Sequence, residues 1–170
     1  ETFAEVLRSN GFIERDSFYE ISKRWIHSIL YTTRPDEVIS LFSDTTEMRS
    51  AHEALFNSEK MLRNIFDNVQ VGVELYDKEG RLVDINTKDL DIFGIEAKED
   101  VLGVNFFENP IVPGEIARNV RNGLEQSFRL DYPFDRLGGY YPSRKKGSVQ
   151  IYTKVTMLYG MSGELVNFLV

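Results

Sequence analysis

The stretch FSDTTEMRSAHEAL, residues 42–55, changes character at its centre. The run VISLF that ends at Phe42 is typical of a strand, whereas the residues after Glu47 have helical spacing and many charges. Asp44 can accept a hydrogen bond from the backbone N–H of Glu47 while the Glu47 side chain reaches back, which is the arrangement of a capping box. We therefore expect a strand to lead directly into a helix here.

The expected helix runs from this junction to Val69, because neither Pro nor Gly interrupts it. Its apolar residues recur with the seven-residue period of a coiled coil. Positions a are Met48, Leu55, Leu62 and Val69, and positions d are Ala51, Ser58 and Ile65. A second helix can pack along this seam and form a homodimer. The alternative is that these residues pack on an adjoining domain, since Ala and Ser make a thin seam.

Strand-like segments precede the junction and predict an antiparallel meander. They span residues 17–22, 25–32 and 37–42. Before them, ETFAEVLRSNGF has Phe3, Val6 and Leu7 at helical spacing and predicts a short amphipathic helix that ends at Asn10-Gly11.

After the long helix, VGVELYD and RLVDIN predict a β-hairpin, with Val71, Val73 and Leu75 on one face of its first strand. Short helices are expected across 88–93 and 97–102, and a longer helix across 114–122, with strands at 127–134, 149–158 and 164–170. Glycines end the helices, and Pro113 precedes the longer one.

The two ends of the chain resemble each other. FAEVLRSNGF (3–12) matches IARNVRNGL (116–124), and EVISLF (37–42) matches ELVNFL (164–169), in the same order. The chain is therefore expected to hold the C-terminal part of a first unit (1–43), a linker helix (44–69) and a complete second unit (70–170). The second copy is longer, and its extra residues fall in the loop at 137–148, whose role the sequence leaves open.

This order of elements, with DTTE followed by the linker helix and the hairpin, resembles tandem PAS domains of bacterial sensor histidine kinases. Residues 44–47 resemble the D-I-T-E signature, with Thr45 in place of Ile, and Asn86 and Gly94 match the residues that open and close the first short helix. The resemblance implies an α+β fold with a five-stranded antiparallel sheet and helices on one face, preceded by a linker helix and part of another PAS unit.

The resemblance also implies a ligand cavity between the inner sheet face and the longer helix. The matching residues are Phe93, Phe107, Ile116, Val120, Phe128, Ile151 and Val155. The alternative is that these residues are plain core. Tyr76 and Tyr152 are either hydroxyls at the cavity rim or surface residues. Asp44, Thr45, Thr46 and Glu47 are expected to relay the signal from sheet to helix.

Composition excludes several classes of site. Without Cys there is no cysteinyl-flavin adduct, and the helix at 114–122 has no His for haem, so both cofactors are disfavoured and any other cofactor is unknown. His27 and His52 are too few for a metal cluster. His52-Glu53 lacks the basic residue and Pro of a phosphoacceptor box. The acids of LFSD, KDLD and KED are expected to form a charged surface, so no catalytic residue and no enzyme activity is predicted for these residues.

The net charge of −7 and the pI near 4.9 disfavour nucleic acid and an anionic membrane as partners. SRKKGS (143–148) is a basic patch that either contacts an acidic partner or forms a solvated turn. With neither a spanning segment nor a secretory leader, we expect a cytoplasmic piece of a longer protein, whose membrane anchoring is left open.

The expected function is that of a sensory and dimerising PAS module of a two-component histidine kinase. A ligand or partner would change the sheet and, through the linker helix, an output domain. The alternatives are a ligand-free dimerisation scaffold, or a PAS module of a transcription regulator or a cyclic-dinucleotide enzyme.

Overall fold

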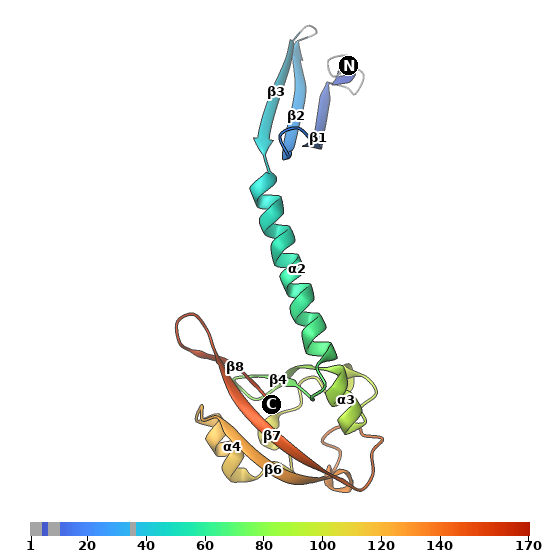
Figure 1. Cartoon of the computed structure of the whole chain (residues 1–170), viewed down its shortest axis with the longest axis vertical. Helices are drawn as coiled ribbons and strands as arrows, with labels where there is room; N and C mark the ends of the chain where they lie inside the picture. Colours follow the sequence, from blue (N-terminus) through green and yellow to red (C-terminus); the bar gives the residue numbers. More distant parts are fainter. Residues whose placement is uncertain (1–4, 7–10, 35–36) are drawn as a thin grey trace. The chain divides into compact units, whose positions relative to one another are not determined.

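The computed structural model describes residues 5–6, 11–34 and 37–170, and it divides the chain into two compact units, Glu1–Met61 and Leu62–Val170 (Figure 1). Each unit is described by itself. The amphipathic helix expected near the N-terminus lies outside the described residues except for Glu5 and Val6.

The first unit contains a three-stranded antiparallel sheet with the order β1-β2-β3. Its strands are β1 (Phe12–Tyr19), β2 (Arg24–Arg34) and β3 (Glu37–Asp44). The prediction of the first strand at 17–22 was wrong at both ends, because Phe12 already pairs with Tyr31 and the chain turns before Lys23, which has φ of 53°. Most residues of β1 are exposed and many are polar, so a search for apolar alternation does not detect the whole strand.

Helix α2 (Thr46–Asn68) follows β3 after a single residue. None of its side chains is buried. The positions a and d that the seven-residue pattern singled out on this helix, such as Leu55, Leu62 and Ile65, are exposed, whereas Val69 lies just beyond the end of α2 and is partly buried. The helix therefore carries an apolar stripe that nothing in the described chain covers.

The second unit has a five-stranded antiparallel sheet with the order β5-β4-β8-β7-β6. Its strands are β4 (Glu74–Asp77), β5 (Leu82–Ile85), β6 (Gln126–Pro133), β7 (Ser148–Tyr159) and β8 (Leu165–Leu169). The last strand thus lies between the first strand and β7, which joins the two ends of this unit in one sheet.

The helices of this unit are α3 (Thr87–Phe93) and α4 (Gly114–Arg121), with 3-10 turns η1 (Lys98–Asp100), η2 (Phe106–Glu108) and η3 (Phe134–Arg136). The expected helix at 97–102 is only the turn η1. As predicted, Asn86 caps the start of α3 and Gly94 ends it with φ of 67°.

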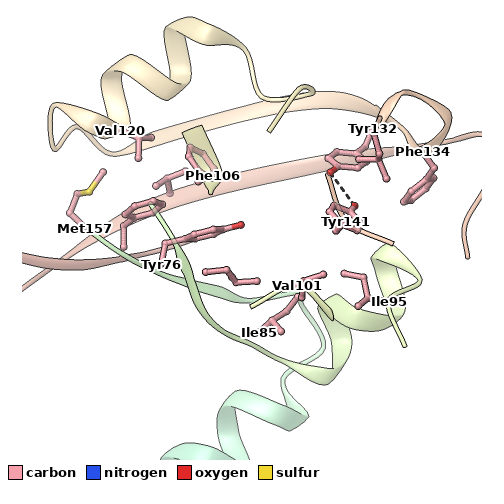
Figure 2. Packing of buried hydrophobic residues seen from close by; sticks show 14 residues of the cluster. Tyr76, Ile85, Ile95, Val101, Phe106, Val120, Tyr132, Phe134, Tyr141 and Met157 are labelled. Atoms are coloured by element: carbon pink, nitrogen blue, oxygen red, sulfur yellow. Dashed lines mark hydrogen bonds between the residues drawn. The ribbon is translucent and has the colours of Figure 1, made fainter. Parts of the chain in front are cut away.

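The core lies on one face of this sheet (Figure 2). Tyr76 of β4 stacks on Phe168 of β8 with ring centroids 5.1 Å apart, and Phe106 packs edge-on against both rings. Val120 from α4 and Val155 from β7 are fully buried beside them. Each buried side chain of this size contributes about 1.5–3 kcal/mol, so this cluster is what holds the helices on the sheet.

Candidate functional site

A cavity of about 620 Å³ lies within the second unit. Its wall is formed by the start of β4, helix α3, strands β6 and β7, and residues of the loop between these two strands. Most of the wall is apolar or aromatic, and its volume is in the range of cavities that hold small molecules.

Of the seven residues expected around a ligand, Phe93, Phe128 and Ile151 line this cavity. The other four, Phe107, Ile116, Val120 and Val155, belong to the core or pack against it, without reaching the wall. The physical reason is that side chains already fill the space between α4 and the sheet. Phe107 packs edge-on to Phe106 at 5.7 Å between centroids, and the Arg121 guanidinium lies 4.4 Å from the centre of the Phe107 ring. A ligand role for any of the seven stays a prediction.

Two acids face each other in the wall, Glu74 from β4 and Asp89 from α3. Glu74 lies two residues before the buried Tyr76, so both side chains point to the inner face of the sheet. The Tyr76 hydroxyl donates a hydrogen bond to Glu74 Oε2 at 2.9 Å. Asp89 is only 5% exposed, its carboxyl hydrogen-bonds with that of Glu74, and no other described residue bonds its Oδ2.

The pKa values of these two carboxyl groups differ from those of exposed acids. Burial and the adjacent Glu74 carboxyl raise the pKa of Asp89 to about 9. Burial likewise raises the pKa of Glu74. Asp89 is therefore mostly protonated at neutral pH, and the two acids together hold fewer than two charges.

Asn86 organises the backbone around these acids. Its Oδ1 accepts from the backbone N–H groups of Val73 and Asp89 at 3.0 and 2.9 Å, and its Nδ2 donates to the carbonyls of Phe66 and Val71, both at 2.9 Å. The fully buried Asn86 thus ties together the last turn of α2, the segment before β4 and the first turn of α3.

Gly72 makes room for Asp89. A Cβ atom at Gly72 would lie 1.9 Å from Asp89 Oδ1, far inside van der Waals contact. Glycine is therefore required here by a close side-chain approach and not by its backbone angles.

The loop at 137–148, whose role the sequence left open, closes the cavity beside α3. It supplies Tyr140 and Tyr141 to the wall. The Ser143 hydroxyl donates to the Phe93 carbonyl at 2.6 Å, and the Arg144 N–H donates to the Gly94 carbonyl at 2.9 Å. The basic patch is accordingly part of the packing of this unit, with Arg144 paired to Glu96.

The tyrosine hydroxyls form a short polar network in the wall. Tyr141 donates to the Tyr132 hydroxyl at 3.0 Å (Figure 2), and Asn109 Nδ2 donates to the same oxygen at 3.4 Å. Burial raises the pKa of both tyrosines, so their hydroxyls are protonated at neutral pH. Since Tyr132 accepts both bonds, its own proton is available to the cavity.

Comparison with solved structures places this architecture. The PAS domain of an HTR-like protein from Haloarcula marismortui matches with a TM-score of 0.52 and 14% identity, over 71% of this chain and 94% of that one. The chain contains a PAS fold. A chain of the E. coli DhaR(N)–DhaL complex matches with a TM-score of 0.51 and 10% identity, over 95% of this chain and 60% of that one. A PAS domain from Colwellia psychrerythraea matches with a TM-score of 0.48 and 18% identity, over 65% and 90% of the two chains.

No protein-family model matches the chain, and no curated protein matches it. The predicted α+β class, with its five-stranded antiparallel PAS sheet, is confirmed. The division into 1–43, 44–69 and 70–170 stays a prediction.

The junction that opened the sequence analysis lies in the first unit, outside the PAS cavity. The Thr45 N–H donates to the Trp25 carbonyl, and the Trp25 N–H donates to Thr46 Oγ1, both at 2.9 Å. The expected capping box is wrong, because Asp44 Oδ1 accepts from the N–H of Thr46, at 3.0 Å, instead of that of Glu47. Asp44 also pairs with Arg24 at 2.9 Å, and the hydrogen bonds from Thr46, with this cation, lower the pKa of Asp44.

The two histidines, a possible metal site and a possible membrane span were also considered from the sequence. His52 is exposed on α2, and His27 contacts Asp16 through Nδ1 at 2.9 Å. In the part of the chain that the structure describes, no three His, Cys, Asp or Glu side chains are grouped to hold a metal. Within the same residues, no helix is both long and apolar enough to span a membrane.

The acids of the cavity were missed by the sequence analysis. Asp89 belongs to KDLD, which was expected to be charged surface, and that expectation was wrong for Asp89 because the residue is buried. Glu74 is the one acid inside the apolar run VGVEL, and a lone charge in a strand pattern is the signal that could have drawn attention to it.

Proposed function

We propose that this chain is a sensory module whose PAS cavity binds a small molecule and passes the resulting change to helix α2. The observation that carries the proposal is the position of Asn86. The same side chain starts α3, which forms part of the cavity wall, and holds the Phe66 carbonyl in the last turn of α2.

A second link supports this route. Arg63, one turn before the end of α2, donates to Asp84 Oδ2 of β5 at 2.6 Å, and this ion pair raises the pKa of Arg63 and lowers that of Asp84. A ligand that moved α3 or β5 would therefore act on the end of α2 through side chains already bonded to it. To shift a two-state balance from 1:99 to 99:1 the ligand must prefer one state by about 5.5 kcal/mol.

The exposed stripe of α2 supports a homodimer as the form in which the module acts. Apolar residues at positions a and d would be buried by the matching helix of a second copy, as in a coiled coil. The junction at residues 44–47 would transmit movement between the first sheet and this helix, since Thr45 and Thr46 bond Trp25 of β2.

The wider role belongs to the same proposal. We place the module in a cytoplasmic part of a two-component sensor histidine kinase, without catalytic residues of its own in this segment. A ligand-free dimerisation scaffold is the alternative that the exposed stripe of α2 also fits.

The test is hydrogen exchange of the last turn of α2 after the cavity is filled. Ile151→Trp places a bulky ring in the wall and should change the exchange of the amides near Phe66. Adding Asn86→Ala should abolish that change. If filling the cavity leaves α2 unaffected, the sensory proposal fails; native mass spectrometry of the purified chain tests separately for a retained molecule and for the dimer.

The junction is tested in the full-length parent. Asp44→Ala removes the carboxylate that pairs with Arg24 and accepts from Thr46, so it should uncouple input from output while the sheet stays folded. Glu53→Ala, at an exposed position of α2 outside the junction, is the matched control. Unchanged signalling in Asp44→Ala would argue against a relay at this position.

A further inference from the structure

The acidic end of the cavity has no matching positive charge facing it. Glu74 and Asp89 line this end, and within the described parts of the chain the side-chain partner of the Asp89 carboxyl is Glu74 itself. The lysine of the wall, Lys154, is exposed and precedes the fully buried Val155 in β7. Because side chains alternate along a strand, Lys154 points to the opposite face of the sheet.

We propose that the cavity selects a small molecule carrying a cationic nitrogen group, an amine or amidine on an apolar or aromatic body, with Asp89 and Glu74 receiving that group. This inference rests on the proposed sensory function and names the class of ligand for the same cavity.

The charge argument begins with the proton that the two acids share. Asp89 keeps this proton at neutral pH because two adjacent buried carboxylates without a counter-charge repel each other. A nitrogen cation that donates to both carboxyls displaces the proton and leaves the acids ionised, with Glu74 Oε2 still accepting from Tyr76. Charge-assisted hydrogen bonds of this kind are about twice as strong as neutral ones. An organic cation therefore takes the place of the shared proton and compensates the charge that Asp89 acquires.

Other ligand chemistries fit this end less well. A carboxylate or phosphate ligand would meet two acids and no facing base, and like charges in a buried site repel strongly. A metal ion needs more ligands than the two acids, and the described residues contain no group of three.

The remaining wall suits the body of such a molecule. The rings of Phe93 and Tyr132 pack edge-on with centroids 4.9 Å apart and both line the cavity, beside Phe128. Aromatic faces attract cations as well as apolar groups. The Tyr132 hydroxyl, which accepts from Tyr141 and Asn109, can donate to an oxygen of the ligand body.

Three probes of the same shape test the charge preference. Benzamidine is cationic, benzamide is neutral and benzoate is anionic at pH 7. Titration calorimetry on the whole chain measures the affinity of each, and amide NMR shifts of α3 and β4 report whether the cavity is the place of binding.

Benzamidine should bind about 10-fold or more tightly than benzamide, and benzoate should bind most weakly. Asp89→Asn should lower the benzamidine affinity by about 10-fold and leave that of benzamide almost unchanged. Asp91→Asn makes the same substitution at an exposed position of α3 and is the matched control, with unchanged affinity for all three probes.

Equal binding of the three probes, tighter binding of benzoate, no benzamidine binding at millimolar concentration, or an unaffected Asp89→Asn variant would each overturn the inference. None of these outcomes touches the sensory proposal, because the exchange experiment with Ile151→Trp needs no cation. Conversely, a selective benzamidine site with no coupling to α2 would leave the ligand class standing and remove the sensory role.

Discussion

The buried carboxyl of Asp89 should make the second unit less stable as the pH rises. Its pKa is raised to about 9 in the folded chain, from an ordinary value of 3.8. Between these values the folded chain keeps a proton that the unfolded chain has released, so the free energy of unfolding falls with increasing pH. One proton gives a slope of about 1.4 kcal/mol per pH unit, which amounts to roughly 2.7 kcal/mol lost between pH 6 and pH 8.

Asp89→Asn keeps the size of the side chain and removes its titration, so the variant should show a much flatter pH dependence. It also removes the second acid beside Glu74, whose raised pKa adds to the same trend. The lowered pKa values of Asp16, Asp44 and Asp84 affect stability only in acid, below about pH 4. The interval from pH 6 to pH 8 therefore isolates the buried pair.

The assay is urea unfolding at pH 6 and pH 8, followed through the amide NMR signals of β4 and β7 so that the second unit is measured alone. Asp91→Asn, exposed on the same helix, should behave like the unmodified chain. The reasoning is refuted if the unmodified chain and Asp89→Asn lose the same free energy of unfolding between the two pH values.

Three further variants probe the surroundings of the cavity and the helix. Gly72→Ala should destabilise the second unit by about 1–3 kcal/mol in urea unfolding, because its Cβ displaces Asp89; a neutral effect would mean that the acid has room to move. Asn86→Ala should cost roughly 2–4 kcal/mol, since a helix cap and two donated bonds are lost, whereas Asn57→Ala on exposed α2 should cost little. Leu62→Asp should weaken dimerisation by about 10-fold or more in analytical ultracentrifugation while Asn57→Asp does not, and an unchanged dimer would exclude α2 as the interface.

Local sequence patterns were sufficient for most of the fold. The cap at Asn86, the glycine at Gly94 and the unbroken run through α2 act over a few residues, so α2 and α3 were predicted close to their observed bounds. At Asp44, by contrast, the backbone N–H that its carboxylate accepts from was predicted wrongly. Thr46 is held there by Trp25, twenty-one residues earlier in the chain, and no local pattern contains that contact.

The cavity shows the other limit of sequence analysis. Three of the seven expected wall residues line it. Phe128 and Ile151 do so because the inner faces of β6 and β7 follow from strand alternation, and Phe93 does so from the end of α3. The cavity was expected beside α4, and it lies beside α3 instead. The space left next to each helix depends on how Phe106, Phe107 and Phe168 fill the core.

By itself, the sequence determined the order of the strands and helices, the antiparallel α+β character and the strand-to-helix junction, since these depend on short-range spacing and turn chemistry. The tertiary structure alone decided that Asp89 is buried beside Glu74 and that the loop at 137–148 closes the cavity beside α3. The physical reason is that burial, and with it the pKa of a carboxyl group, is set by segments that come from opposite ends of the unit and meet only in the folded sheet.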